Sequence, residues 1–332
     1  QDGTQRVLTG DFAFSDEKGA QLMALAAEEA ANQGVNVAIN WVGQPDAIPV
    51  STEEEEESAG SGTYHDAYNF DWFARDSGMR TGVTDAWNLL FNAGVLGDNW
   101  IRLAVLDMGF RDDPDLRNPT LGTAWPGIGP LNVESSGCQS GACPWHGMSV
   151  ASAAMAVQNN RLGSAGSGGP VARPSLVFTT YDMFAGITAV WLAKGMGARI
   201  INMSYGAGLP WIVEWTAAGF RWATNDVADT GVLLFAAAGN TGLNVDREVC
   251  FLGICWEETF RTPCENGGVI CVGGLDSPNT PASNSNWGDH SVDLWGPWCV
   301  DVGPTPDDDS FHQACGTSIA SPFVAGVAAL TW

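Results

Sequence analysis

The chain carries very little positive charge. Only 14 of its 332 residues are lysine or arginine, against 38 aspartates and glutamates, so the formal net charge is −24 at pH 7. Just two residues, Lys18 and Lys194, are lysines. Nucleic acids and anionic membranes attract basic surfaces, so this composition argues against either as a partner. It predicts a strongly hydrated acidic surface, either of a secreted or salt-adapted protein or simply of a soluble acidic one.

The chain also lacks a long apolar run. No uncharged apolar stretch approaches the roughly 18 residues that a membrane-spanning helix needs, and no signal peptide is visible. With 45% hydrophobic residues, the chain can nevertheless bury a full-sized core. Because it starts at Gln1 and stops one helix-like run after Ser318, we expect a processed or trimmed chain.

The Cys-x-x-Cys spacing of a zinc site is absent, although the chain has eight cysteines. Disulfides between cysteines that are neighbours along the sequence would close short loops. The last two cysteines are then left to pair with each other. The pairs expected from this proximity are Cys138–Cys143, Cys250–Cys255, Cys264–Cys271 and Cys299–Cys315. Such bonds would indicate an oxidising, extracellular compartment. The alternative is eight buried free thiols.

Composition divides the chain into three segments. Residues 5–42 have the pattern strand, helix, strand, so residues 1–50 are interpreted as an N-terminal extension. Residues 51–79 contain five consecutive glutamates and a Ser/Gly-rich patch, which predicts an acidic linker because like charges repel and cannot form a core. Residues 80–332 hold the remaining pattern and form the main domain.

Apolar strand-like runs alternate with helical stretches in the main domain. The expected strands are 101–106, 176–179, 200–203, 232–236, 269–272 and 292–294, and the expected helices are 84–90, 146–156, 184–195 and 212–228. This alternation predicts an α/β fold in three layers, a doubly wound and mostly parallel sheet with helices on both faces. Functional residues of such sheets gather at the carboxyl ends of the strands, where Asp107 is expected.

Three separated blocks hold the residue types of nucleophilic catalysis. Asp107 ends the run Ile101–Asp107, His146 opens His-Gly-Met-Ser-Val-Ala-Ser, and Ser318 lies in Gly-Thr-Ser-Ile-Ala-Ser-Pro-Phe-Val-Ala-Gly. A helix N-terminus favours negative charge near Ser318, and Pro322 is expected in the first helical turn. A serine hydroxyl needs a base such as imidazole, which a carboxylate orients. In the order Asp, His, Ser, these blocks resemble the subtilisin-like serine proteases (subtilases) over roughly residues 80–332.

The resemblance implies a secreted endopeptidase with an acyl-enzyme intermediate, in which Ser318 is the nucleophile, His146 the base and Asp107 its partner. The run ending in Asn240 resembles the block whose amide points into the oxyanion hole. The resemblance also assigns substrate binding to Ser204, Tyr205, Gly206, Ala238 and Gly239. It implies a monomer that acts on proteins or peptides and needs no cofactor for its chemistry. Whether the protein binds a structural calcium ion is left open, and no residue is assigned as a metal ligand.

Several alternatives stay open. Within the family, residues 1–50 are either a propeptide-like unit or a structural extension docked on the catalytic domain. The rival to an active protease is a catalytically weak or inactive binding or structural protein on the same scaffold. An acid-acting relative with a Glu–Asp–Ser set is disfavoured because His146 stands in the His-Gly motif. The other histidines, His65, His290 and His312, are interpreted as structural.

Two departures from the family pattern bear on the site. Met108 stands where the family usually has a small hydroxyl residue, and only Tyr181–Gly186 replaces a longer segment that forms a second wall of the cleft. The segments expected to line the main pocket, Ser204–Gly206 and Ala238–Asn240, carry no charge. We therefore expect apolar residues to be preferred over lysine or arginine just before the cut bond.

Overall fold

The computed structural model describes residues 44–45, 47–49, 81–96, 100–124, 145–158, 160, 163–251, 254–303 and 312–332. All of them belong to one compact unit, Trp41–Trp332. The predicted strand-helix-strand pattern of residues 5–42, the acidic linker 51–79, and Cys138 and Cys143 lie outside the described residues. The division into three segments therefore stays a prediction.

An eight-stranded sheet runs through the centre of the unit in the order β13-β12-β8-β6-β3-β5-β4, with β14 also pairing with β12. Its strands are β3 (Ile101–Asp107), β4 (Thr120–Thr123), β5 (Ala172–Phe178), β6 (Ile200–Met203), β8 (Leu233–Ala237), β12 (Val269–Ser277), β13 (Thr280–Pro281) and β14 (Leu294–Pro297). Every pairing is parallel except that of β12 with β13. Each apolar run expected to be a strand in residues 80–332 contributes to this sheet, the run 292–294 only through Leu294.

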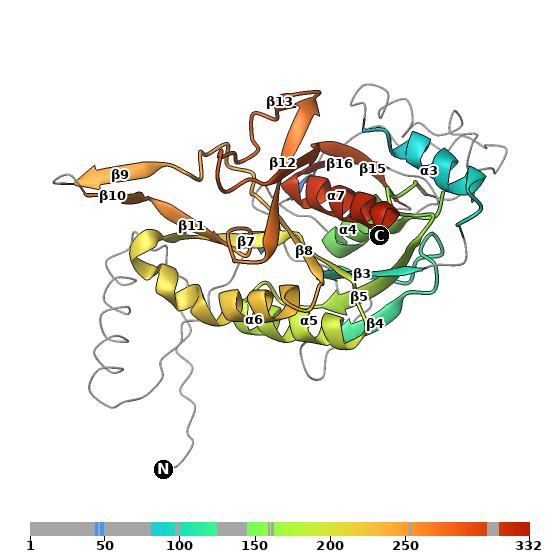
Figure 1. The fold of residues 1–332 in the computed structure, drawn as a ribbon, viewed down its shortest axis with the longest axis horizontal. Helices are drawn as coiled ribbons and strands as arrows, with labels where there is room; N and C mark the ends of the chain where they lie inside the picture. The colour runs from blue at the N-terminus through green and yellow to red at the C-terminus, as the bar shows by residue number, and fades with distance from the viewer. Residues whose placement is uncertain are drawn as a thin grey trace, which may run out of the picture. The chain divides into compact units, whose positions relative to one another are not determined.

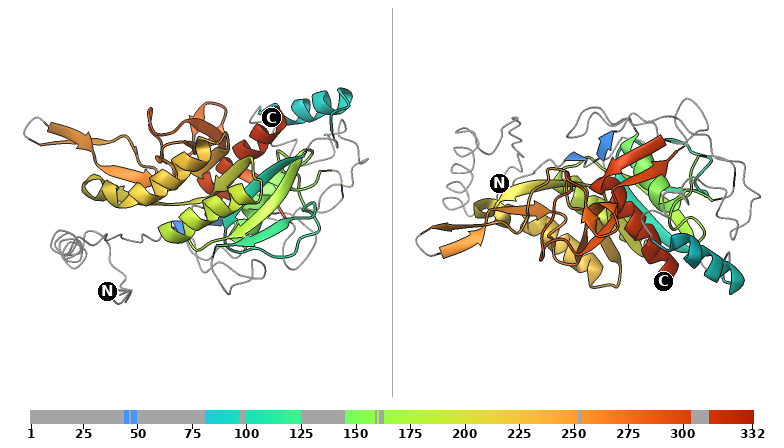
Figure 2. Two further views of the ribbon diagram at one scale, coloured as in Figure 1. Left: turned by 60° about the horizontal axis from the view of Figure 1, so that its bottom comes forward. Right: turned by 90° about the horizontal axis from the view of Figure 1, so that it is seen from above.

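Helices cover both faces of the sheet. α4 (His146–Met155) and α7 (Thr317–Thr331) pack against each other on one face, and α5 (Met183–Gly195) and α6 (Ala218–Ala228) pack against each other on the other (Figures 1 and 2). α3 (Val83–Asn92) contacts α7, and the 3₁₀ helix η2 (Trp211–Ala217) leads into α6. The predicted three-layer, doubly wound α/β fold is confirmed. It follows from strands that are apolar on both faces and so need helices on each side.

Short antiparallel strands, which the sequence pattern did not predict, surround this frame. One small sheet has the order β1-β7-β11, from β1 (Gln44–Pro45), β7 (Tyr205–Pro210) and β11 (Thr259–Thr262). Another has the order β15-β16-β2, from β15 (Cys299–Val302), β16 (His312–Gly316) and β2 (Ala47–Pro49). A hairpin of β9 (Glu248–Phe251) and β10 (Ile254–Glu257) projects from the body (Figure 1).

Three of the expected cysteine pairs are disulfides in the structure. Cys250–Cys255 joins the two strands of the hairpin, Cys264–Cys271 ties the segment after β11 to β12, and Cys299–Cys315 joins β15 to β16. The last bond braces the strand that leads directly into α7 and Ser318. Free cysteines are absent from the described part of the chain.

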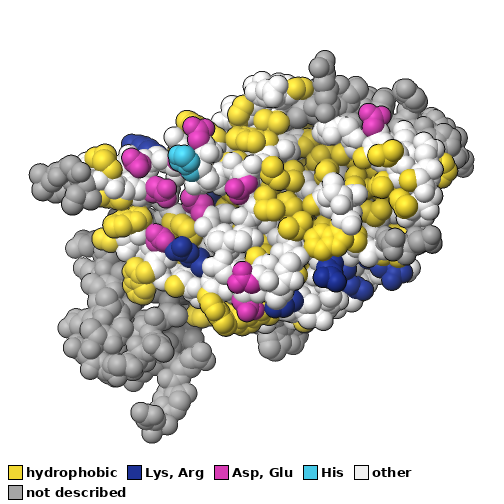
Figure 3. Space-filling view, viewed as in Figure 1, with side chains coloured by type: hydrophobic (Ala, Val, Ile, Leu, Met, Phe, Trp, Pro, Cys, Tyr) yellow, Lys and Arg dark blue, Asp and Glu magenta, His cyan; other side chains and the backbone are white. Residues whose placement is uncertain are grey.

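The surface differs between the two halves of the face in Figure 3. Acidic side chains gather over the half that carries the β9–β10 hairpin and β11, whereas apolar side chains gather over α3 and α7 (Figure 3). Within the described ranges, none of the helices has the length and apolar character needed to cross a membrane.

Candidate active site

Asp107 and His146 form a buried hydrogen-bonded pair. Asp107 ends β3 and His146 begins α4, and their side chains are 0% and 1% exposed. His146 Nδ1 lies 2.9 Å from Asp107 Oδ1 and 3.0 Å from Oδ2. A Cβ on Gly109, whose φ is +82°, would lie 2.9 Å from the His146 backbone nitrogen, so this turn requires glycine. The other ring nitrogen, Nε2, is buried and has no hydrogen-bond partner within the described residues.

Two further donors hold the Asp107 carboxylate. The Met108 N–H donates to Oδ1 at 2.8 Å, and the Tyr181 hydroxyl donates to the same oxygen at 2.6 Å. Tyr181 lies in the short connection between β5 and α5, where Asp182 caps α5 by accepting from Ala185 N at 3.1 Å. Burial, followed by the negative charge of Asp107, raises the pKa of Tyr181 well above its ordinary value, so its hydroxyl stays a donor.

Sequence reasoning missed Tyr181 as part of the site. The segment Tyr181–Gly186 was noted only for its length, as a reduced wall of the cleft. In the structure, α5 begins at Met183, so the connection is short and its tyrosine points inward to Asp107. The signal available was a tyrosine directly after an apolar strand, which by itself does not specify an inward rotamer.

Ser318 is the second residue of α7 and is fully buried. Its hydroxyl donates to the Ser204 carbonyl at 3.0 Å, and the Ser204 hydroxyl donates to the Ser318 carbonyl at 2.8 Å. Pro322 lies inside the helix rather than in its first turn, so that expectation was wrong. Proline at this position removes the N–H that would bond the Ser318 carbonyl, and Ser204 supplies the missing donor.

Asn240 follows β8 and contacts the residue before Ser318. Its Oδ1 accepts from both the backbone N–H and the hydroxyl of Thr317, each at 2.9 Å. The amide is thereby oriented, and its Nδ2 is buried without a partner in the part of the chain that the structure describes. An oriented N–H donor beside a nucleophile is what a developing oxyanion needs.

These residues share one edge of the sheet. Asp107 ends β3, and Asn240, Ser204 and Tyr181 follow the carboxyl ends of β8, β6 and β5. These strands are neighbours in the order β8-β6-β3-β5. Leu106 pairs with Met203, so Asp107 and Ser204 are the next residues on adjacent strands. Parallel strands bring their carboxyl ends together, which is why residues far apart in sequence meet here.

Two strands from the N-terminal part of the chain pair with the segments that frame the site. Gln44 pairs with Gly206 and Pro45 with Tyr205, the two residues of β7 that are expected to bind substrate. Ala47 pairs with Gly316, two residues before Ser318. Among the described strands, β1 has β7 on one side and none on the other. β1 therefore pairs with the strand that follows Ser204, and β2 pairs with the strand that leads into Ser318.

Arg261 is a half-buried residue of β11 that sequence reasoning also missed. A Cβ on Gly239 would lie 2.4 Å from Arg261 Cζ, and a Cβ on Gly206 would lie 3.6 Å from the same atom. The guanidinium thus lies between the two segments expected to line the main pocket. No local pattern indicates this, because the pairing of β11 with β7 brings the arginine there.

Two of the remaining histidines, His290 and His312, are not part of this site. His290 is exposed on a turn, and His312 begins β16, where burial lowers its pKa. His65 lies outside the described residues.

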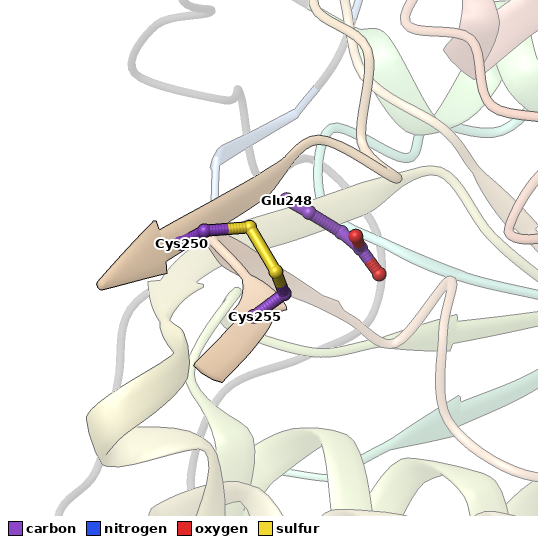
Figure 4. Close-up of side chains that lie close together, drawn as sticks. All are labelled: Glu248, Cys250 and Cys255. Atoms are coloured by element: carbon purple, nitrogen blue, oxygen red, sulfur yellow. A yellow bond between two sulfur atoms is a disulfide. The ribbon is translucent and has the colours of Figure 1, made fainter. Parts of the chain in front are cut away.

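In the described ranges, Glu248, Cys250 and Cys255 form a group with metal-ligand atoms close together (Figure 4). Both sulfurs are in the hairpin disulfide, so they are not available as thiolate ligands.

Comparisons with known proteins agree with this geometry. The model of the subtilase family (Peptidase_S8) matches residues 98–332. A thermostable alkaline protease of Halalkalibacterium halodurans is 28% identical over 330 residues, which cover 96% of this chain and 82% of that protein. The prenylagaramide maturation protease PagA has 25% identity and a TM-score of 0.56, over 75% of this chain and 79% of that one.

A second solved structure extends the likeness in fold. The epidermin leader peptide processing serine protease of Staphylococcus aureus has 17% identity and a TM-score of 0.60, over 92% of this chain and 78% of that one. Together with the family match, these findings define the class as a serine protease with a subtilisin-like fold. The chain belongs to the subtilase family and is a subtilisin-like serine endopeptidase. Enzymes of this family need no cofactor for catalysis.

Proposed function

We propose that this subtilase hydrolyses peptide bonds through Asp107, His146 and Ser318, with an acyl-enzyme intermediate. The observation that carries the proposal is the buried hydrogen bond between Asp107 and His146 Nδ1, which leaves Nε2 without a partner within the described residues. Ser318, on α7, hydrogen-bonds to Ser204, which follows β6, and Asn240 follows the neighbouring strand β8. His146 would act as the base, Ser318 as the nucleophile and Asn240 as the oriented amide donor.

The proposed reaction begins when the Ser318 hydroxyl turns from the Ser204 carbonyl and gives its proton to His146 Nε2. Its Oγ attacks the substrate carbonyl carbon, and the negative oxygen is bound by Asn240 Nδ2 and the Ser318 backbone N–H. His146 then returns the proton to the leaving amine as the C–N bond breaks. Water, activated by the same imidazole, hydrolyses the ester and releases the acid. Asp107 holds the imidazole in the required tautomer throughout.

A nucleophile-directed reagent tests this role. An organophosphorus or sulfonyl fluoride reagent should modify Ser318 and abolish peptidase activity, and peptide mapping by mass spectrometry locates the adduct. Ser318→Ala should lower kcat by about 10⁶, the scale known for nucleophile variants of subtilisins. A folded wild-type sample that is neither labelled nor active would leave the chain as a scaffold for binding rather than catalysis.

We also propose that the residues before position 47 form a propeptide-like unit that the enzyme removes itself. Support comes from β1 and β2, which pair with β7 and β16 as an extended peptide would on the two sides of a cut bond. Ser318 Oγ lies 3.0 Å from the carbonyl of Ser204, which directly precedes Tyr205, the partner of Pro45. If the pairing of Pro45 with Tyr205 is extended by one residue, residue 46 is opposite Ser204. The bond between residues 46 and 47 would then be the one that is cut.

N-terminal sequencing of the folded protein tests the self-removal. Wild-type chains should acquire a new N-terminus at Ala47, whereas Ser318→Ala chains should keep the original one. Identical, uncut N-termini in both would favour the alternative of a structural extension.

We further propose that the protein is secreted and acts on protein or peptide substrates. The three disulfides support an oxidising compartment, because cytosolic thiols are kept reduced. A monomeric state, the absence of nucleic-acid and membrane partners, and any structural calcium ion stay predictions. Gel filtration and activity with and without a chelator would test the first and the last.

A further inference from the structure

The position of Arg261 follows from strand register. Arg261 lies opposite Gly208 in the antiparallel pair of β11 and β7. Directly opposed side chains share a face of a sheet, as do residues two apart on one strand. The Arg261 side chain therefore lies on the face of β7 that belongs to Gly206 and Gly208. A Cβ on Gly208 would meet no atom within 4 Å, so the end of the arginine side chain lies nearer to Gly206.

The guanidinium reaches across to the second wall of the pocket. A Cβ on Gly206 would lie 3.5 Å from Arg261 Nη2, and a Cβ on Gly239 would lie 2.5 Å from the same atom. Gly206 belongs to β7 and Gly239 to the turn after β8, and these are the two segments expected to line the main pocket. The rest of this lining, Ser204–Gly206 and Ala238–Asn240, is uncharged. Arg261 therefore places a guanidinium between two lining segments that carry no charged side chain.

A bound substrate would present one particular side chain to this charge. A peptide that pairs with β7 in the register of β1 has one residue opposite Gly206 and another, two further along, opposite Ser204. Both side chains point to the Gly206 face, which is the face of Arg261. The residue opposite Ser204 precedes the cut bond, because Ser318 Oγ is 3.0 Å from the Ser204 carbonyl.

We propose that Arg261 makes this enzyme select aspartate or glutamate at the residue immediately before the cut bond. A guanidinium is permanently charged and offers a planar fork of donors that matches a carboxylate. Its charge repels lysine and arginine, and burying it under an apolar side chain is unfavourable. This selection replaces the expectation of an apolar preference, and it rests on the proposed role of Ser318 as nucleophile.

The chain's own sequence agrees with this selection. The residue between Pro45 and Ala47, after which the chain is proposed to cut itself, is aspartate. One specificity thus accounts both for cleavage of other proteins and for removal of the N-terminal unit.

The decisive measurement is kcat/KM across peptides that differ only in the residue before the cut bond, with Asp, Glu, Phe and Lys compared. The acidic peptides should be cut about 10- to 100-fold better than the Phe peptide, the range of one charge-assisted hydrogen bond. The Lys peptide should be the poorest. Arg261→Gly should lose the acidic preference, and Arg261→Glu should invert it in favour of Lys.

Matched controls separate specificity from folding. Arg247→Gly removes an exposed arginine that pairs with Glu258 at 3.2 Å, and it should leave the order of peptides unchanged. Arg261→Lys keeps the charge and should retain part of the acidic preference. Labelling of Ser318 by the organophosphorus reagent shows in every variant whether the nucleophile is intact, independently of pocket charge.

Self-removal gives a second readout. Asp46→Lys should slow the appearance of the Ala47 N-terminus, and combining it with Arg261→Glu should restore it. A wild-type enzyme that labels at Ser318 but cuts the Phe peptide as well as the Asp peptide would overturn the role of Arg261 and leave the proposed function standing. If Arg261→Gly left the ratio of kcat/KM for the Asp peptide to that for the Phe peptide unchanged, this would also overturn the role of Arg261. Loss of both labelling and cleavage in folded wild-type protein would overturn both.

Discussion

Ser204 and Ser318 exchange two hydrogen bonds across the site, each hydroxyl donating to the backbone carbonyl of the other residue, at 2.8 and 3.0 Å. The bond from Ser204 compensates for Pro322, which has no N–H to offer the Ser318 carbonyl inside α7. The Ser318 carbonyl in the first turn of α7 is therefore bonded by Ser204, the residue that follows β6, and not by an N–H of the helix. This ties the position of the proposed nucleophile to the central sheet.

Ser204→Ala should destabilise the protein by about 1–3 kcal/mol, because it leaves the buried Ser318 carbonyl without a donor. Pro322→Ala restores a helical N–H, so Ser204→Ala should cost less in that background. Urea unfolding of the two single variants and the double variant gives the coupling energy. Thr331→Ala, at the far end of the same helix, should add independently to Pro322→Ala and serves as the control.

Asn240→Ala should lower kcat by about 10²–10³ with KM nearly unchanged, the range known for loss of one oxyanion-hole donor in enzymes of this kind. The reason is that Nδ2, held by the contacts of Oδ1 with Thr317, would meet the substrate oxygen mainly when that oxygen is charged. Steady-state kinetics on one peptide measures both constants. A rise in KM with normal kcat would contradict this role, and Asn244→Ala, which removes an acceptor for the Asp246 N–H, should change neither.

Tyr181→Phe should lower kcat by about tenfold, equivalent to about 1.4 kcal/mol, and leave KM nearly unchanged. The substitution keeps the ring, which lies 6.5 Å from the His146 ring and 5.3 Å from that of Tyr205, and removes only the donor to Asp107. Asp107 and the imidazole would then be held less firmly during proton transfer. A merely structural tyrosine would instead change the melting temperature and leave kcat intact.

Thr224→Val is the matched control for Tyr181→Phe. It also deletes a buried hydroxyl, one that donates to the Arg221 carbonyl within α6 at 3.0 Å. It should affect stability alone, so a similar fall in kcat for this variant would count against the positioning role of Tyr181.

Glu265 should make stability depend on pH near neutrality. Burial raises its pKa to about 7 from 4.5, although it accepts from the Arg261 N–H and from Ser291 Oγ. The folded state thus holds a proton that the unfolded chain has released, so this residue lowers stability as pH rises from about 4.5 to 7. Glu265→Gln should remove this pH-dependent loss of stability. The difference in free energy of unfolding between the variant and wild type should therefore grow by up to about 3 kcal/mol as pH rises from about 4.5 to 7.

Chemical unfolding at several pH values between 4 and 8 measures the effect of Glu265. Glu248→Gln changes an exposed carboxylate on the hairpin and should follow the wild-type pH dependence. A constant difference between Glu265→Gln and wild type over the whole range would exclude the buried carboxyl as the cause.

The amino-acid sequence by itself predicted the frame of this protein. The alternation of apolar strands with helical runs specified the three-layer parallel fold, because strands apolar on both faces require helices on each side. The same alternation explains why Asp107 was expected at the end of a strand. The cysteine pairs of the described region were also expected, because Cys250–Cys255 and Cys264–Cys271 close short loops and leave Cys299 and Cys315 for each other.

Tertiary structure decided what surrounds these residues. Tyr181 reaches Asp107 only because the connection from β5 to α5 is short, and Ser204 satisfies the Ser318 carbonyl only because β6 ends beside α7. Arg261 lies between Gly206 and Gly239 through the pairing of β11 with β7. Residues 44–45 and 47–49 reach the site in the same way, through β7 and β16. Such contacts depend on strand pairing between distant segments, and local periodicity carries no information about which segments pair.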